Sequence, residues 1–241
     1  MIREIVLAIR KRQPKVGVRK LQRHVNQRLQ PEKINVGRDR LFELLRFWKL
    51  LIRPKRNFQR TTNSRHWFKI YKNLIKDKKP IRPNEIWVAD ITYIKIRGKF
   101  CYLFLIMGLF SRRVMGYNVS HSLTAEGALK ALLMALKQRS DSLPLIHHSD
   151  RGLQYCCDDY VGLLKKHGVE ISMTEENHVY ENAFAERLNG ILKSEFLLRR
   201  EFSTIKIVKR IVADSVEIYN KERLHTNLNY RTPQDVYYAK N

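Results

Sequence analysis

The chain has 241 residues, of which 44% are hydrophobic and 29% are charged. This is enough apolar material for one large domain, or for a mid-sized domain with a small companion. No apolar run reaches the roughly 20 residues that cross a bilayer, and Arg3 and Glu4 interrupt the apolar block that a signal peptide needs. We therefore expect a cytoplasmic protein with no membrane partner.

The cysteines exclude two further classes of protein. There are three, Cys101, Cys156 and Cys157. Two of them are adjacent, which suits neither a disulfide framework nor the C-x-x-C spacing of a zinc site. A cysteine-based zinc module at the N-terminus is excluded because no cysteine precedes residue 101.

Positive charge dominates the chain and is concentrated at its beginning. Lys and Arg number 47 against 23 Asp and Glu, a formal net charge of +24. Residues 1–80 hold 24 Lys or Arg against 5 Asp or Glu, which is +19 of that excess. Such a segment attracts polyanions, and the charge alone leaves DNA binding, RNA binding of the ribosomal kind and plain solubility open.

Three short basic helices are predicted within residues 1–52. Apolar side chains recur at helical spacing in residues 2–12, 18–29 and 36–48. Short helices with short connections are typical of a helix-turn-helix, whose last helix enters the major groove by its N-terminal end. Arg38 and Arg40 occupy that end, and Arg19 and Lys20 on the second helix are further candidates for DNA contact. The alternative is a helical hairpin with solvated charges.

A basic linker and a larger α/β region follow. Residues 53–83 lack apolar periodicity and include a pair of closing prolines, so we expect a linker that lies on DNA phosphates. From residue 84 onward, β-branched and aromatic runs predict a three-stranded meander up to residue 120. The pattern then predicts a helix at 124–139 capped by Thr124, a strand at 143–148, a helix at 157–167, a strand at 169–173, a loop at 174–180 and a helix at 181–199.

This order of elements predicts the fold class. Antiparallel strands followed by alternating helix and strand are expected of a mixed α/β domain with an RNase H-like sheet, although other α/β folds share parts of the order. We assign residues 84–200 to this core and residues 201–241 to a C-terminal helical extension.

Three acidic residues stand out within the core. Asp90 lies in an apolar strand, where a carboxylate must be paired or bound to metal. Asp150 follows a buried strand, a common place for functional groups, although Asp before Arg-Gly also suits a turn. Glu186 lies in a helical pattern, where a Glu is ordinarily only a helix former.

Taken together, these acids carry a resemblance. The strings are WVADITYI at 87–94, HHSDRGLQY at 147–155 and YENAFAERLNGILKSE at 180–195, with 35 residues between Asp150 and Glu186. They resemble the three motifs of the DDE transposase and retroviral integrase superfamily, and most closely those of second-reading-frame transposases of bacterial insertion sequences. GVRKL at 17–21 and YNKERLHTNLNYRTPQDVY at 219–237 extend the resemblance over nearly the whole chain.

The resemblance implies a catalytic triad and its cofactor. In that family Asp90, Asp150 and Glu186 would be both catalytic residues and metal ligands, holding two Mg²⁺ or Mn²⁺ ions per site with Asp90 bridging them. Hard cations prefer carboxylate oxygens, which agrees with Asp and Glu standing where a zinc site would use Cys or His.

Other residues near the motifs have weaker assignments. Lys193 lies seven residues after Glu186, two helical turns away on the same face, where it would hold a DNA phosphate unless it is an ordinary surface lysine. His148 and Arg151 flank Asp150 and are candidates for DNA contact. Glu175, Glu176 and Glu181 are interpreted as solvated charges, with Glu181 standing where the family often has Asp. No role is assigned to His225.

The sequence therefore predicts an insertion-sequence transposase that cleaves DNA and joins it to a target. Its expected partners are the element's terminal repeats, target DNA and further copies of itself on DNA. The family also implies an upstream helix-turn-helix protein fused by ribosomal frameshifting. A nuclease that only hydrolyses DNA, and a DNA-binding protein with an inert core, are the alternatives.

Overall fold

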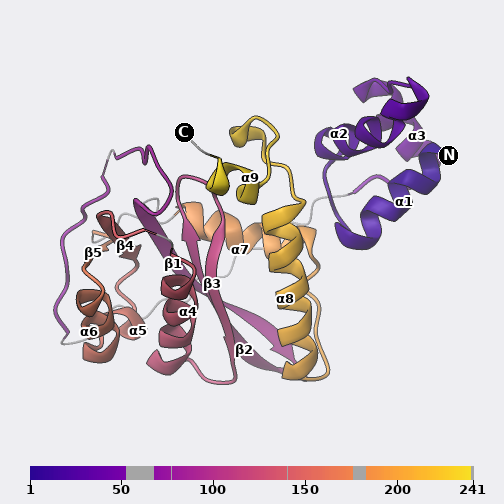
Figure 1. Cartoon of the computed structure of the whole chain (residues 1–241). Coiled ribbons are helices and arrows are strands. Elements are labelled where there is room, and N and C mark those ends of the chain that lie inside the picture. The colour runs from indigo at the N-terminus through magenta and orange to yellow at the C-terminus, as the bar shows by residue number, and fades with distance from the viewer. Residues whose placement is uncertain (53–67, 77, 140, 176–182, 240–241) are drawn as a thin grey trace.

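The computed structural model describes residues 1–52, 68–76, 78–139, 141–175 and 183–239 (Figure 1). The chain runs in this order: α1 (Ile2–Arg12), α2 (Val18–Leu29), η1 (Gln30–Glu32), α3 (Arg38–Phe47), β1 (Ile86–Ile96), β2 (Lys99–Gly108), β3 (Val114–Ser120), α4 (Ala125–Lys137), β4 (Leu145–Ser149), α5 (Leu153–Cys156), α6 (Asp158–Lys166), β5 (Val169–Met173), α7 (Ala183–Glu195), α8 (Ile205–Lys221), η2 (Thr226–Leu228) and α9 (Pro233–Tyr238).

The five strands form one mixed sheet in the order β3-β2-β1-β4-β5. β1 pairs antiparallel with β2, and β2 with β3, which confirms the predicted meander. On its other side β1 pairs in parallel with β4, and β4 in parallel with β5. β1 is therefore the central strand, and its apolar sequence follows from burial on both faces.

Alternate residues of β1 serve two apolar layers. Ile86 and Val88 belong to the core cluster that includes α7 and α8, whereas Trp87 and Ala89 belong to the cluster of α4, α5 and α6. Figure 1 shows α4 and α7 on opposite sides of the strands. α4 approaches closely because β3 contributes Gly116, where a Cβ atom would lie 2.1 Å from the carbonyl oxygen of Ala131.

Several boundaries differ from the predicted ones. The last core helix ends at Glu195 and does not reach residue 199, because Leu197 takes a left-handed backbone with φ of 63°. The segment expected as one helix at 157–167 is preceded by a separate turn of helix, α5. Thr124 does occupy the N-cap of α4, although its side chain makes no capping hydrogen bond.

The C-terminal helix α8 packs in the same apolar cluster as α7. Within the described part of residues 53–83, the expected linker contacts the sheet edge: the Leu74 N–H donates to Ser172 Oγ at 2.9 Å. The division of the chain at residues 52, 83 and 200 stays a prediction.

Helices α1, α2 and α3 enclose a small core of their own, built from Val6, Leu21, Val25, Leu41 and Leu45 among others. Most of their basic residues lie on the outer faces, as is typical of amphipathic helices, whereas Arg10 and Lys20 are only partly exposed. Figure 1 shows this N-terminal cluster beside the end of α8 that leads to η2 and α9. In the described part of the chain, no helix combines the length and the apolar character needed to cross a membrane.

Candidate active site

Asp90 sits on the central strand with both carboxylate oxygens engaged. Its Oδ1 accepts from the Ile91 N–H at 2.8 Å, and its Oδ2 accepts from Asn189 Nδ2 at 2.6 Å. The first bond is local to β1, whereas the second comes from α7. The carboxylate is thus oriented from both its own strand and the helix that covers it.

Asp150 lies next to Asp90 because of the register of two parallel strands. Val88 of β1 pairs with His148 of β4, and the two acids each follow two residues later. The Gly152 N–H donates to Asp150 Oδ1 at 3.0 Å. A Cβ atom at Gly152 would itself meet that oxygen at 3.0 Å, so glycine allows the close turn around the carboxylate.

The surroundings make it unfavourable for both acids to be ionised. Burial, followed by the charge of Asp150, raises the pKa of Asp90 to about 7, with a smaller contribution from Glu186. The hydrogen bonds from Asn189 and Ile91 act in the opposite direction. Burial also raises the pKa of Asp150, against the hydrogen bond from Gly152.

One face of α7 carries three polar residues near Asp90. Glu186, Asn189 and Lys193 follow one another at intervals of three and four residues, which places them on one side of the helix. Glu186 is exposed in the first turn, whereas Asn189 is buried. Lys193 Nζ lies 4.9 Å from the centre of the Tyr93 ring on β1. Burial lowers the pKa of Lys193, and the nearby Asp90 charge opposes that shift.

A hard divalent cation fits the chemistry of these donors. Asp90 and Asp150 offer only carboxylate oxygens, and a cation between them would relieve the repulsion that raises the pKa of Asp90. Across the residues that the structure describes, no group of three or more His, Cys, Asp or Glu side chains is close enough to hold a metal ion. The two strand acids are therefore adjacent, while Glu186 influences Asp90 without completing a metal cage.

The sequence prediction missed Asn189, which contacts Asp90 directly. Its Oδ1 is buried and has no hydrogen-bond partner. The available signal was its spacing, three residues after Glu186 and four before Lys193.

The basic residues predicted to contact DNA fall into two groups. Arg19, Arg38 and Arg40 are exposed on the N-terminal helices. Arg38 pairs with Asp39 at 2.8 Å and Arg40 with Glu43 at 3.2 Å, both as surface contacts that an incoming phosphate can replace. Near the acids, Arg151 is partly buried, and its Nε donates to the Thr174 carbonyl at 2.7 Å.

Two of the predicted DNA contacts are engaged within the protein: His148 is buried and Lys20 is only partly exposed. His148 is 0% exposed, and its Nδ1 lies 2.8 Å from Ser172 Oγ on the neighbouring strand. Lys20 points into the molecule, where its Nζ lies 3.2 Å from Glu195 Oε1. His148 therefore presents no surface to DNA in this structure, whereas Lys20 keeps part of its surface exposed and its contact with DNA stays a prediction. Glu176 and Glu181 lie outside the described residues, and Glu175 is exposed.

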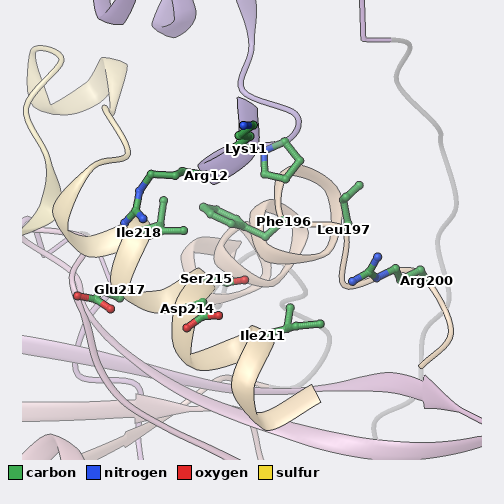
Figure 2. Close-up of a pocket in the computed structure, with 11 residues that line it drawn as sticks. Lys11, Arg12, Phe196, Leu197, Arg200, Ile211, Asp214, Ser215, Glu217 and Ile218 are labelled. Atoms are coloured by element: carbon green, nitrogen blue, oxygen red, sulfur yellow. The ribbon is translucent and has the colours of Figure 1, made fainter. Parts of the chain in front are cut away.

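The molecule also has a hollow that is separate from the acids. It has a volume of about 340 Å³ and lies between the end of α1, the end of α7 and α8 (Figure 2). Phe196 and Ile218 contribute apolar surface, and Arg12 and Glu217 are among its charged lining residues. None of Asp90, Asp150 and Glu186 lines it, so it is not the place of the proposed chemistry.

Sequence comparison identifies relatives over most of the chain. Residues 80–178 and 167–233 match two sequence families, each described as an integrase core domain. The insertion element IS600 uncharacterized 31 kDa protein of Shigella sonnei is 36% identical over 219 residues, which are 90% of this chain and 79% of that protein. Transposase InsF for insertion sequence IS3fB of Escherichia coli (strain K12) is 34% identical over 184 residues. That match covers 76% of this chain and 64% of InsF, so the chain spans less than two thirds of that relative.

Solved structures agree on the fold. The HTLV-2 integrase catalytic core domain in complex with magnesium matches with a TM-score of 0.54 at 17% identity, over 66% of this chain and 100% of that one. A chain of the simian T-cell lymphotropic virus intasome matches with a TM-score of 0.58 at 16% identity, over 91% of this chain and 71% of that one. These matches confirm the predicted RNase H-like architecture. Together with the identity to the insertion-element proteins, they lead to one conclusion: the chain belongs to the family of insertion-sequence transposases that carry an integrase core domain.

Proposed function

We propose that this chain catalyses DNA cleavage and strand transfer for an insertion sequence, using two Mg²⁺ or Mn²⁺ ions held by Asp90, Asp150 and Glu186. The observation that carries the proposal is the pair of half-buried carboxylates at neighbouring parallel strands, Asp90 on β1 and Asp150 directly after β4. A pair of this kind is unfavourable for folding alone, which is typical of residues retained for function.

The residues around the acids have distinct roles in this proposal. When bound, the metal ions supply an activated oxygen nucleophile and neutralise charge on the phosphoryl and leaving oxygens. Asp90, whose pKa is raised by burial and by the charges of both Asp150 and Glu186, would hold metal together with these two acids. Asn189 orients Asp90 through the 2.6 Å hydrogen bond. Lys193, close enough to feel the Asp90 charge, holds a DNA phosphate beside the acids.

The N-terminal helices bind the terminal repeats in this scheme. Arg38 and Arg40 lie at the N-terminal end of α3, and both are exposed as groove or phosphate contacts require. Arg19 on α2 and Arg151 beside the acids add contacts to phosphate. We include assembly of several copies on DNA and a fusion to an upstream helix-turn-helix protein as parts of the proposal. Both can be tested by comparing the chain alone with the fusion in the assay below.

A strand-transfer assay tests the proposal. Labelled terminal repeats are incubated with target DNA and Mg²⁺ or Mn²⁺, and cleaved and joined products are separated by size. We expect the wild-type protein to give joined product only when metal is present, and Asp150→Asn to give none above background. Equal joining by the two proteins would refute the role of Asp150.

The same assay separates the alternatives. A nuclease of the same active-site type would give nicked ends that are never joined. A DNA-binding protein with an inert core would bind the repeats with strong salt dependence and leave them intact. Either result contradicts the proposed transfer reaction.

A further inference from the structure

Helix α7, which carries the proposed catalytic face, ends in a cluster of charged side chains that are largely shielded from solvent. Its last residue, Glu195, accepts two hydrogen bonds from the Arg223 guanidinium. Nε donates to Oε2 and Nη2 donates to Oε1, each at 2.8 Å. Lys20 of α2 contacts the same carboxylate at 3.2 Å. The side chains of Arg223, Lys20 and Glu195 are only 5%, 15% and 19% exposed. A bidentate pair shielded from water in this way fixes direction as well as distance.

His225 completes the cluster by contacting the third guanidinium nitrogen, Nη1. Arg223 Nη1 lies 2.8 Å from His225 Nε2. A guanidinium can only donate, so this ring nitrogen must accept and must be unprotonated. Burial, followed by the charge of Arg223, lowers the pKa of His225 to about 2, in agreement with a neutral ring. The ring also packs edge-on against Tyr219, with centroids 5.2 Å apart.

The backbone of α7 ends at the same point. The Lys15 N–H, from the segment between α1 and α2, donates to the Glu195 carbonyl oxygen at 3.2 Å. Carbonyl groups in the last turn of a helix have no partner within the helix, so this bond satisfies one of them. The N-terminal helices therefore touch both the side chain and the main chain of a single residue of α7.

The geometry gives α7 two polar attachments on either side of Lys193. Asn189 ties the middle of the helix to Asp90, and Glu195 ties its end to Arg223 and Lys20. A helix is stiff over thirteen residues, so holding two points along it sets the direction of the face that bears Glu186. Beside the second attachment lies the hollow of Figure 2, so close apolar packing is interrupted there.

We propose that Glu195 is a positioning residue for the active site, oriented by Arg223 and His225. Lys20 joins the N-terminal helices to the same carboxylate, so their docking and the placement of Glu186 are coupled. This inference rests on the proposed function, because Glu186 is taken as the third metal ligand. It also assigns a role to the C-terminal segment 219–237, which lies far from the acids in sequence.

The first test compares Glu195→Gln with Arg12→Met. The glutamine keeps the shape of Glu195 and removes its charge. Arg12 pairs with Glu222 and so also joins the N-terminal helices to the core, but as an exposed side chain in a pair that does not include Glu195. Hydrogen exchange of the α7 amides, binding of labelled element ends, and strand transfer are measured on each full-length protein.

We expect Glu195→Gln to speed exchange of the α7 amides by about tenfold and to lower joining by a similar factor, within the range for mutations that alter coupling between sites. End binding should change by less than about twofold, a difference of the size expected away from the contact surface. Arg12→Met should leave α7 exchange and joining at wild-type values.

A second pair of variants keeps the test decisive if Glu195→Gln does not fold. His225→Phe removes the acceptor for Arg223, whereas His225→Gln supplies another. Faster α7 exchange in the first, with recovery in the second, supports the positioning role. Equal exchange in all variants and wild type overturns it, as does a loss of joining and end binding by the same factor. If the wild-type protein joins no DNA, the proposed function fails, while α7 exchange still decides whether this cluster holds the helix.

Discussion

The strand side and the helix side of the candidate site are built in different ways. Asp90 and Asp150 are placed by the register of β1 and β4 and are held by hydrogen bonds from the backbone of Ile91 and Gly152. Glu186 is placed by α7, whose direction depends on side-chain contacts at Asn189 and Glu195. The strand side is thus fixed by backbone pairing. The position of the helix side depends on side chains, which substitutions far from the acids can change.

The two sides also differ in their electrostatics. Burial raises the pKa of both strand acids, whereas Glu186 is exposed. Removing an acid from the strand side should therefore relieve most of the repulsion, and removing Glu186 should relieve much less. We therefore expect substitution of a strand-side acid to lower activity while raising stability.

The largest effect is expected for Asp150→Asn. Joining should fall by about 10³-fold, the upper range for loss of one charge-stabilising group. In the absence of divalent metal at pH 7, the unfolding temperature should rise, because one of two repelling buried carboxylates has gone. Thermal unfolding and strand transfer on the same preparation check both signs. A lower unfolding temperature would contradict the electrostatic account.

Glu186→Gln should lower joining by about 10²-fold and change the free energy of unfolding by less than about 0.5 kcal/mol, as is usual for an exposed position. Glu175→Gln is the matched control, since Glu175 is likewise exposed but lies before α7, outside the proposed set of metal ligands. The control should join DNA at the wild-type rate. Equal losses for the two variants would remove the distinction between Glu186 and its acidic neighbours.

Asn189→Ala weakens the link between the two sides. It removes the donor to Asp90 Oδ2, and we expect joining to fall about tenfold and the free energy of unfolding to fall by about 1–2 kcal/mol. Chemical denaturation and single-turnover joining measure the two quantities. Wild-type joining by this variant would show that Asp90 needs no support from α7.

The smallest effect on activity is expected for His147→Gln, which tests the stability of the strand side at acid pH. Burial lowers the pKa of His147, on β4, to about 3. Above the unfolded value of about 6.5 the group is neutral in both states, so it contributes no pH dependence. As the pH falls below that value, only the unfolded chain gains the proton, and stability should fall by about 1.4 kcal/mol per pH unit from this group. His147→Gln should reduce the slope between pH 6.5 and 5, and an unchanged slope would contradict the burial argument.

Much of the fold was predictable, because each element carries its own pattern. The apolar run of β1, the meander and the amphipathic helices α1 to α3 follow from local sequence. Helix ends were less predictable. α7 ends at Glu195 because Leu197 takes a left-handed backbone, and no glycine or proline at that point indicates the end.

Site residues that belong to a sequence motif were predictable. Residues whose role depends on tertiary contacts were not. Spacing and resemblance led to Asp90, Asp150 and Glu186, but Asn189 resembled any helical residue. The sequence did not reveal that Lys20 pairs with Glu195 or that His148 is buried, because it does not show which face of a basic helix or of a strand meets the core. His225 had no assigned role until Arg223 and Glu195 were seen beside it.

Asp90, Asp150 and Glu186 are proposed to hold the two metal ions together. Anomalous diffraction from a crystal of the protein with element-end DNA and Mn²⁺ tests it most directly. We predict manganese density between the carboxylates of Asp90 and Asp150, with Glu186 completing the ligands. Manganese bound elsewhere, or bound by the two strand acids with Glu186 turned toward solvent, would contradict this account.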